Sequence, residues 1–157
     1  MKKSLKLLVI FLVSIVAVGC ATFNTVNEMP TAVDFKVKSL QPPLGKSLVY
    51  VVRPTLLGKP FGGNITANGE YIGTTQGGMY VYTVLAPGEY KFEVTGHDND
   101  SEVVVNLEAN KIYYIKESVF PGFWRGFTSL KLLDKDEGRK DLDNCTLGDK
   151  LGKNILP

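Results

Sequence analysis

The side chains that most often carry enzymatic chemistry are scarce in this chain. Its 157 residues include one histidine, His97, and two cysteines, Cys20 and Cys145. Any Ser-His-Asp or Cys-His arrangement must use His97. That residue lies beside Asp98 in a predicted hairpin loop, where mobility would spoil the geometry that proton transfer needs. His97 and Cys145 cannot supply the four ligands of a zinc site. We therefore predict no catalytic residues, no metal and no dissociable cofactor.

The acidic residues after His97 have the spacing that opens a calcium loop. Asp98, Asp100 and Glu102 occupy alternate positions, but a calcium loop of the EF-hand type needs glycine at its sixth position and glutamate at its twelfth. This chain has Val103 and Ala109 there. We interpret the segment as a solvated turn, with a weak divalent-cation site as the alternative.

Cys20 has the sequence context of a cysteine that receives a lipid. Three lysines in the first six residues precede the run 7–18, which is apolar except for Ser14 and is too short to span a bilayer comfortably. The residues Ala17-Val18-Gly19-Cys20 resemble the lipobox of bacterial lipoproteins, with alanine where leucine is commonest. The resemblance implies cleavage before Cys20, which then carries diacylglycerol and an N-acyl chain. The alternative is an ordinary signal peptide with an incidental cysteine.

Lipidation at Cys20 implies a place in the cell and limits other chemistry. Two or three acyl chains give stable membrane attachment, and Ala21, in place of the aspartate that retains lipoproteins at the inner membrane, favours the periplasmic face of the outer membrane if the cell has two. Cys145 is then the one remaining thiol, and we expect it to be buried. The 18 basic and 16 acidic residues become 15 and 16 without the three signal lysines, so we predict no nucleic-acid partner.

An aromatic segment near the end of the chain is the candidate binding site. The stretch 120–127 reads Phe-Pro-Gly-Phe-Trp-Arg-Gly-Phe. Tryptophan and arginine dominate binding hot spots, and an exposed aromatic loop would mark such a site. The candidate ligand- or partner-binding residues are Phe61, Phe120, Phe123, Trp124 and Arg125. The competing interpretation, which we favour, is that the phenylalanines and the tryptophan fold back to plug the open end of the domain.

The elements that position these residues are short strands. Runs rich in Val, Ile, Tyr and Phe, separated by Gly, Pro and Asn, predict strands. We place them near 48–53, 63–68, 70–74, 79–85, 89–95, 102–107, 111–117 and 127–133. Asn68-Gly69 suits a two-residue hairpin, and a short helix is expected near 136–143. Seven or eight short strands without a long helix predict a single antiparallel all-β, immunoglobulin-like sandwich.

The signal-like run, the strand runs and the polar stretches together divide the chain into segments. We expect a cleaved signal peptide at 1–19, a lipidated N-terminus and flexible tether at 20–46, the β-sandwich at 47–148 and a C-terminal tail at 149–157. Within the tether, the alternation over 33–37 could add an edge strand.

Several of these motifs together resemble a known bacterial family. They are Tyr50-Val51-Val52-Arg53-Pro54, Asn68-Gly69 with Ile72-Gly73, Tyr80, Ala86-Pro87-Gly88-Glu89-Tyr90 and Lys111-Ile112-Tyr113-Tyr114. Over about residues 46–147 the chain resembles the domain of unknown function 2846, and its hairpin and Pro-Gly turn also resemble small sandwich modules of the PEGA type. The resemblance implies a sandwich fold and a secreted or lipid-anchored envelope protein. It supplies no catalytic residues.

We therefore predict a noncatalytic lipoprotein of the bacterial cell envelope that acts as a membrane-anchored binding or structural module. Its expected partners are the membrane, through the lipid, and another envelope protein. The main alternative is a glycan- or small-ligand-binding module that uses the aromatic loop 120–127. A third hypothesis is an enzyme that uses His97 or Cys145.

Overall fold

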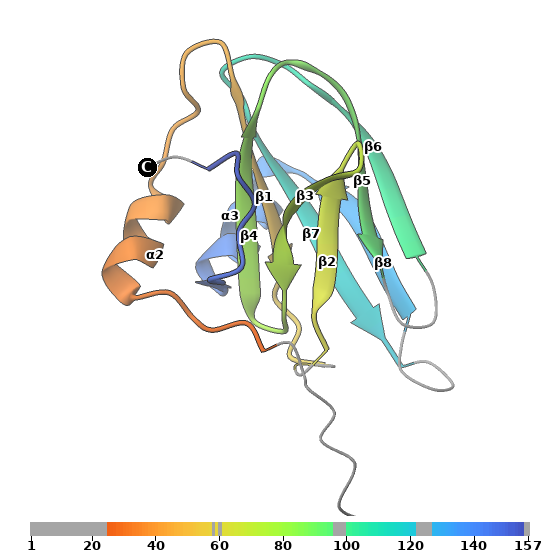
Figure 1. The fold of residues 1–157 in the computed structure, drawn as a ribbon. Helices are drawn as coiled ribbons and strands as arrows, with labels where there is room; N and C mark the ends of the chain where they lie inside the picture. The colour runs from red at the N-terminus through yellow and green to blue at the C-terminus, as the bar shows by residue number, and fades with distance from the viewer. Residues whose placement is uncertain (1–24, 58, 60, 96–99, 122–126, 156–157) are drawn as a thin grey trace, which may run out of the picture.

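Two β-sheets packed face to face form the domain (Figure 1). The computed structural model describes residues 25–57, 59, 61–95, 100–121 and 127–155. The strands are β1 (Ser47–Arg53), β2 (Gly63–Ala67), β3 (Glu70–Thr75), β4 (Met79–Leu85), β5 (Gly88–Thr95), β6 (Asp100–Leu107), β7 (Ile112–Phe120), β8 (Phe127–Leu133) and β9 (Thr146–Leu147), and the helices are α2 (Thr31–Lys38) and α3 (Lys135–Asp143). The predicted all-β sandwich with a short C-terminal helix is confirmed.

The sheet order places β1 at the centre of the larger sheet. The orders are β8-β7-β1-β4-β9 and β3-β2-β5-β6. β1 pairs antiparallel with β4 but parallel with β7, so the larger sheet is mixed and not wholly antiparallel as predicted. All eight predicted strands are present, and β7 extends three residues beyond its predicted end. Asn68 and Gly69 take the positive φ angles of 48° and 79° that the predicted hairpin turn requires.

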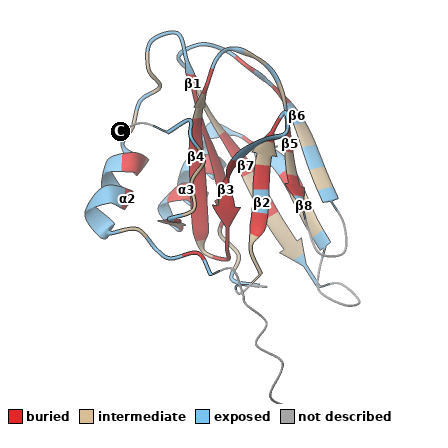
Figure 2. Ribbon diagram, viewed as in Figure 1, coloured by how far each residue is buried: buried red, intermediate tan, exposed pale blue. Residues whose placement is uncertain are grey.

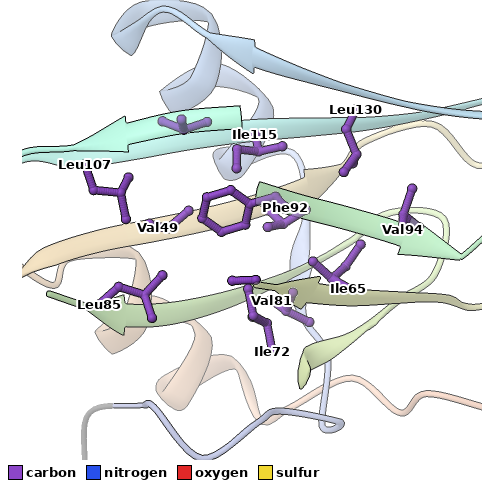
Figure 3. Close-up of a cluster of buried hydrophobic side chains, with 13 residues drawn as sticks. Val49, Ile65, Ile72, Val81, Leu85, Phe92, Val94, Leu107, Ile115 and Leu130 are labelled. Carbon is purple, nitrogen blue, oxygen red and sulfur yellow. The ribbon is translucent and has the colours of Figure 1, made fainter. Parts of the chain in front are cut away.

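The main core lies between the two sheets and follows the expected alternation. Along β5, Phe92 and Val94 are buried while Lys91 and Thr95 are exposed, as the period of two in a strand dictates. Figure 3 shows Phe92 among aliphatic side chains from both sheets. The labelled members of this cluster are Val49, Ile65, Ile72, Val81, Leu85, Phe92, Val94, Leu107, Ile115 and Leu130.

A second core covers the opposite face of the larger sheet. Every residue of β1 is buried (Figure 2), because its alternate side chains enter two different cores. On this outer face Tyr50 stacks on Tyr114 with ring centroids 5.6 Å apart, and α2 and α3 cover the tyrosines. Gly138 lets α3 approach closely, since a methyl group on it would lie 2.3 Å from Cγ of Tyr114.

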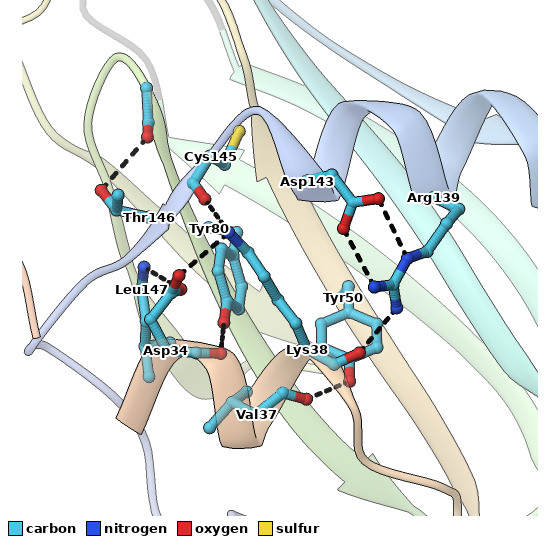
Figure 4. A network of polar contacts seen from close by, with 11 residues as sticks. Asp34, Val37, Lys38, Tyr50, Tyr80, Arg139, Asp143, Cys145, Thr146 and Leu147 are labelled. Carbon is cyan, nitrogen blue, oxygen red and sulfur yellow. Dashed lines mark hydrogen bonds and ion pairs between the residues drawn. The ribbon is translucent and has the colours of Figure 1, made fainter. Parts of the chain in front are cut away.

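The N-terminal segment corrects the predicted tether. Residues 25–46 are not a flexible linker: α2 spans Thr31–Lys38 where the alternation suggested an edge strand over 33–37. Asp34 and Val37 are buried, and Figure 4 shows Asp34 accepting a hydrogen bond from the backbone N–H of Leu147 at 2.9 Å. Asp34 also pairs with Lys38 at 2.9 Å. The prediction failed because α2 is held by buried contacts with distant residues rather than by an amphipathic stripe of its own.

The C-terminal residues are also part of the domain rather than a tail. The backbone N–H of Thr74 donates to the carbonyl of Lys150 at 3.0 Å, and that of Val84 to the carbonyl of Asn154 at 2.8 Å. The segment from 149 to 155 therefore lies along β3 and β4. The predicted boundary at 148 was wrong for these described residues.

Candidate functional site

One end of the sandwich collects the connections that could bind a partner, and we call it the loop end. It consists of the β1–β2 connection (54–62), the β3–β4 turn (76–78) and the adjoining ends of β7 and β8. β1, β3, β5 and β7 end here, and their partners begin here (Figure 1). The predicted site residues Phe61 and Phe120 both lie at this end. Phe123, Trp124 and Arg125 lie outside the described residues.

A buried ion pair lies beneath the loop end. Arg53, the last residue of β1, approaches Glu117 of β7 with Nη1 and Oε1 3.5 Å apart, and the two side chains are 2% and 0% exposed. Thr75 donates a hydrogen bond from its hydroxyl to Oε2 of Glu117. Gly63 makes room for the pair, because a methyl group there would lie 2.6 Å from Oε1. Side chains from three strands, β1, β3 and β7, thus meet at one carboxylate between the two sheets.

The guanidinium of Arg53 also fixes the β1–β2 connection. Its Nη1 donates to the carbonyl of Phe61 at 2.8 Å, and its Nη2 donates to the carbonyl of Leu57 at 3.3 Å. Arginine presents its donors in a rigid planar fork. One buried side chain therefore ties both halves of the connection to the sheet.

Burial acts on both charges of the pair. Burial raises the pKa of Glu117, and the Arg53 charge and the Thr75 hydrogen bond oppose that rise. Burial also lowers the pKa of Arg53, and Glu117 opposes that change. Removing two charges from water costs free energy that their attraction seldom exceeds. We infer that the pair positions the loop rather than adding stability.

The loop end displays apolar side chains. Leu56 and Leu57 in the β1–β2 connection are 64% and 48% exposed, and Phe120 and Phe127, which face each other across β7 and β8, are 54% and 47% exposed. Phe61 is half-buried. The preferred interpretation of a plug is therefore wrong for Phe120 and Phe127. Leu56 and Leu57 were not predicted as site residues.

The other polar candidates do not assemble a site in the described part of the chain. His97 and Asp98 lie outside the described residues. Glu102 points to solvent on β6, where it pairs with Lys91 at 3.5 Å. Among the residues that the structure describes, no group of three or more histidine, cysteine or acidic side chains could hold a metal ion.

Cys145 is buried, as expected, behind α2 and α3. It is 1% exposed, and burial raises the pKa of its thiol to about 12. The thiolate is the reactive form of cysteine, so this geometry keeps the side chain inert at neutral pH.

Cys145 should therefore react very slowly with thiol reagents in the folded protein. At pH 8, modification of the lipidated protein by Ellman's reagent should be at least about a thousandfold slower than in urea, because the thiolate fraction falls by about that factor. Absorbance of the released thionitrobenzoate measures both rates. Rapid stoichiometric reaction of the folded protein would contradict the prediction and support the thiol-enzyme hypothesis.

Comparison with known proteins shows that the part of the sequence that contains the ion pair matches a protein family. The family described as "Protein of unknown function (DUF2846)" matches residues 43–123, a range that includes Arg53, Thr75 and Glu117. An "Uncharacterized protein" of Haemophilus influenzae is 24% identical over 137 residues, which are 86% of this chain and 79% of that protein. No solved structure matches the chain. Within the described residues, neither helix is long and apolar enough to cross a bilayer. The chain belongs to the family of proteins of unknown function DUF2846.

Proposed function

We propose that the protein is a noncatalytic lipoprotein of the bacterial cell envelope, anchored through lipid on Cys20 and acting as a binding or structural module. The observation that carries this proposal is how soon the fold begins after that cysteine. Val26 is 6% exposed, and Asn27 donates to both carboxylate oxygens of Asp149, at 2.9 and 2.8 Å. Buried contacts of the domain are therefore present within six residues of Cys20.

The short link limits where the domain can work. Six residues of extended chain span at most about 22 Å, which is similar to the length of one strand of the sandwich. A lipid-anchored domain of this kind would stay next to the membrane surface. This proximity suits a module that positions another envelope protein, on the outer membrane if the cell has two membranes.

The prediction that tests the anchor concerns Cys20. Cys20→Ala should abolish labelling by radioactive palmitate and leave the precursor uncleaved, because position 20 then has no thiol to accept diacylglycerol. Gel mobility and fatty-acid labelling in growing cells measure the two effects. Cys145→Ser is the matched control and should still be labelled and cleaved. A Cys20→Ala protein that matures and carries lipid would refute the proposal.

Glycan binding is the second candidate function, favoured by the exposed pair Phe120 and Phe127. Aromatic faces of this kind can stack on sugar rings, and Trp124 lies between them in sequence. Titration with soluble cell-wall fragments should then shift the fluorescence of this single tryptophan. Unchanged emission at saturating fragment concentrations would count against this candidate. Crosslinking in intact cells tests the preferred protein partner.

A further inference from the structure

The exposed apolar side chains of the loop end lie close to the point where the fold begins. A methyl group on Gly148 would lie 2.9 Å from Cγ1 of Val26 and 3.8 Å from Sδ of Met79. Met79 follows Gly78, where a methyl group would lie 3.0 Å from Cδ2 of Leu56. A continuous series of contacts thus links the first buried residue to the β1–β2 connection. Figure 1 shows the segment that leads into α2 starting at the end of the sandwich where the β1–β2 connection lies.

The length of the link from Cys20 bears on which end of the sandwich can face the membrane. The link spans at most about 22 Å. The seven residues of β4 extend about 23 Å at 3.3 Å per residue. If the opposite end contacted the lipid, the link would have to run the whole length of β4 at full extension. With the loop end toward the membrane, the link needs little of its reach.

We propose that the loop end rests in the lipid headgroup layer, with Leu56, Leu57, Phe120 and Phe127 in contact with lipid. This inference rests on the proposed lipid anchor and adds an orientation to it. A second, weak membrane contact beside a strong one acts at high effective concentration. Partly exposed leucine and phenylalanine side chains are therefore sufficient, although they would bind weakly without the anchor.

In this proposal the loop end is held at the membrane by apolar contact with lipid and not by attraction between charges. In sequence, the connections that join the strands at this end contain the basic residues Lys59 and Arg125 and the acidic residue Asp98, and β6 begins with the acidic residue Asp100. These charges offset one another, so attraction to anionic headgroups is not expected to dominate. The orientation should accordingly change little between low and high salt, since salt screens exposed charges and leaves apolar contacts intact.

The test uses the lipidated full-length protein in vesicles of phosphatidylethanolamine with a minor fraction of phosphatidylglycerol. A nitroxide label is attached at Leu56→Cys, at Phe120→Cys or at Leu44→Cys. Leu44 is the matched control because it is 94% exposed and precedes β1 at the opposite end. Cys145 is buried and stays unlabelled. The collision rates of each label with oxygen and with a nickel chelate report its depth in the membrane.

We expect the ratio of oxygen to nickel collisions to be several-fold higher at positions 56 and 120 than at position 44. The joint substitution Leu56→Ser and Leu57→Ser should lower the ratio at position 120, with Leu44→Ser as its control. Equal, water-like ratios at all three positions in protein that floats with the vesicles would overturn the orientation alone. Failure to float would instead refute the anchor. Protection of position 120 by wall fragments but not by lipid would assign the loop end to glycan and overturn the proposal.

Discussion

Arg53→Met should lower the free energy of unfolding by about 3–5 kcal/mol at neutral pH, because it leaves the Glu117 carboxylate buried without its cation. The variant also loses the hydrogen bonds from the guanidinium to the carbonyls of Phe61 and Leu57. Chemical denaturation monitored by circular dichroism measures the loss. A change below about 1 kcal/mol would show that the pair is not buried as described.

The pH dependence of this variant has a definite sign. Burial already raises the pKa of Glu117, and loss of Arg53 removes the charge that opposes the rise. When a folded-state carboxyl has a raised pKa, the stability that its protonation contributes is present below the unfolded pKa of about 4.3. It is lost as pH rises through the folded pKa. The deficit of Arg53→Met should therefore be smallest near pH 4 and largest at neutral pH.

The matched control removes the second charge as well. Arg53→Met combined with Glu117→Gln should recover most of the lost stability at neutral pH, because an amide costs far less to bury than a carboxylate. Its stability should also lose the pH dependence attributed to Glu117. If the double variant is as unstable as Arg53→Met and keeps the same pH profile, the uncompensated carboxylate is not the cause.

The strands were predictable from sequence because their signals are local. Alternation along β5 and the turn residues Asn68 and Gly69 depend on neighbouring residues alone. β1 is predictable for another reason, since its residues enter cores on both faces and its inner five, 48–52, form one apolar run. The parallel pairing of β1 with β7 could not be predicted, because it joins segments about 60 residues apart.

The ion pair was missed although the sequence carries a signal for it. Val49, Val51 and Arg53 alternate on the core face of β1, and Ile115 and Glu117 do so on β7. A charge in the inward phase of a strand indicates a buried partner. The phase alone cannot say which cation meets which carboxylate. The exposure of Leu56 and Leu57 could not be predicted from the sequence either, because it follows from the hydrogen bonds by which Arg53 holds the β1–β2 connection.

The structure of residues 25–40 could not be predicted from the local sequence, because contacts with distant residues stabilise it. α2 has no side-chain N-cap, and its main attachments are to residues far along the chain. Lys38 donates to the carbonyl of Cys145 at 2.5 Å, and the hydroxyl of Tyr50 donates to the carbonyl of Val37 at 2.7 Å. Asp34 lies at the centre of this network (Figure 4).

Asp34→Ala should lower the free energy of unfolding by about 2–4 kcal/mol, because it leaves the buried N–H of Leu147 without an acceptor and Lys38 without its carboxylate. Asp34→Asn can keep the acceptor while it loses the charge, so it should cost only about 1 kcal/mol. Urea denaturation ranks the two variants, and hydrogen exchange at the Leu147 amide reports the local effect. Equal losses from both substitutions would show that the charge, rather than the N–H acceptor, holds α2.

The same substitution separates stability from orientation at the membrane. The proposed orientation depends on a link of six residues, and that length holds only while the segment from Val26 through α2 stays on the sheet. If Asp34→Ala releases this segment, the free chain between Cys20 and Ser47 grows to 27 residues, with a reach several times longer. The sandwich would then lose its fixed height, and the label at Leu56→Cys should become more accessible to the nickel chelate while the protein still floats with the vesicles. Asp34→Asn should leave that label in the lipid. This difference between the two variants would show that the short link, and not the apolar side chains alone, keeps the loop end at the membrane.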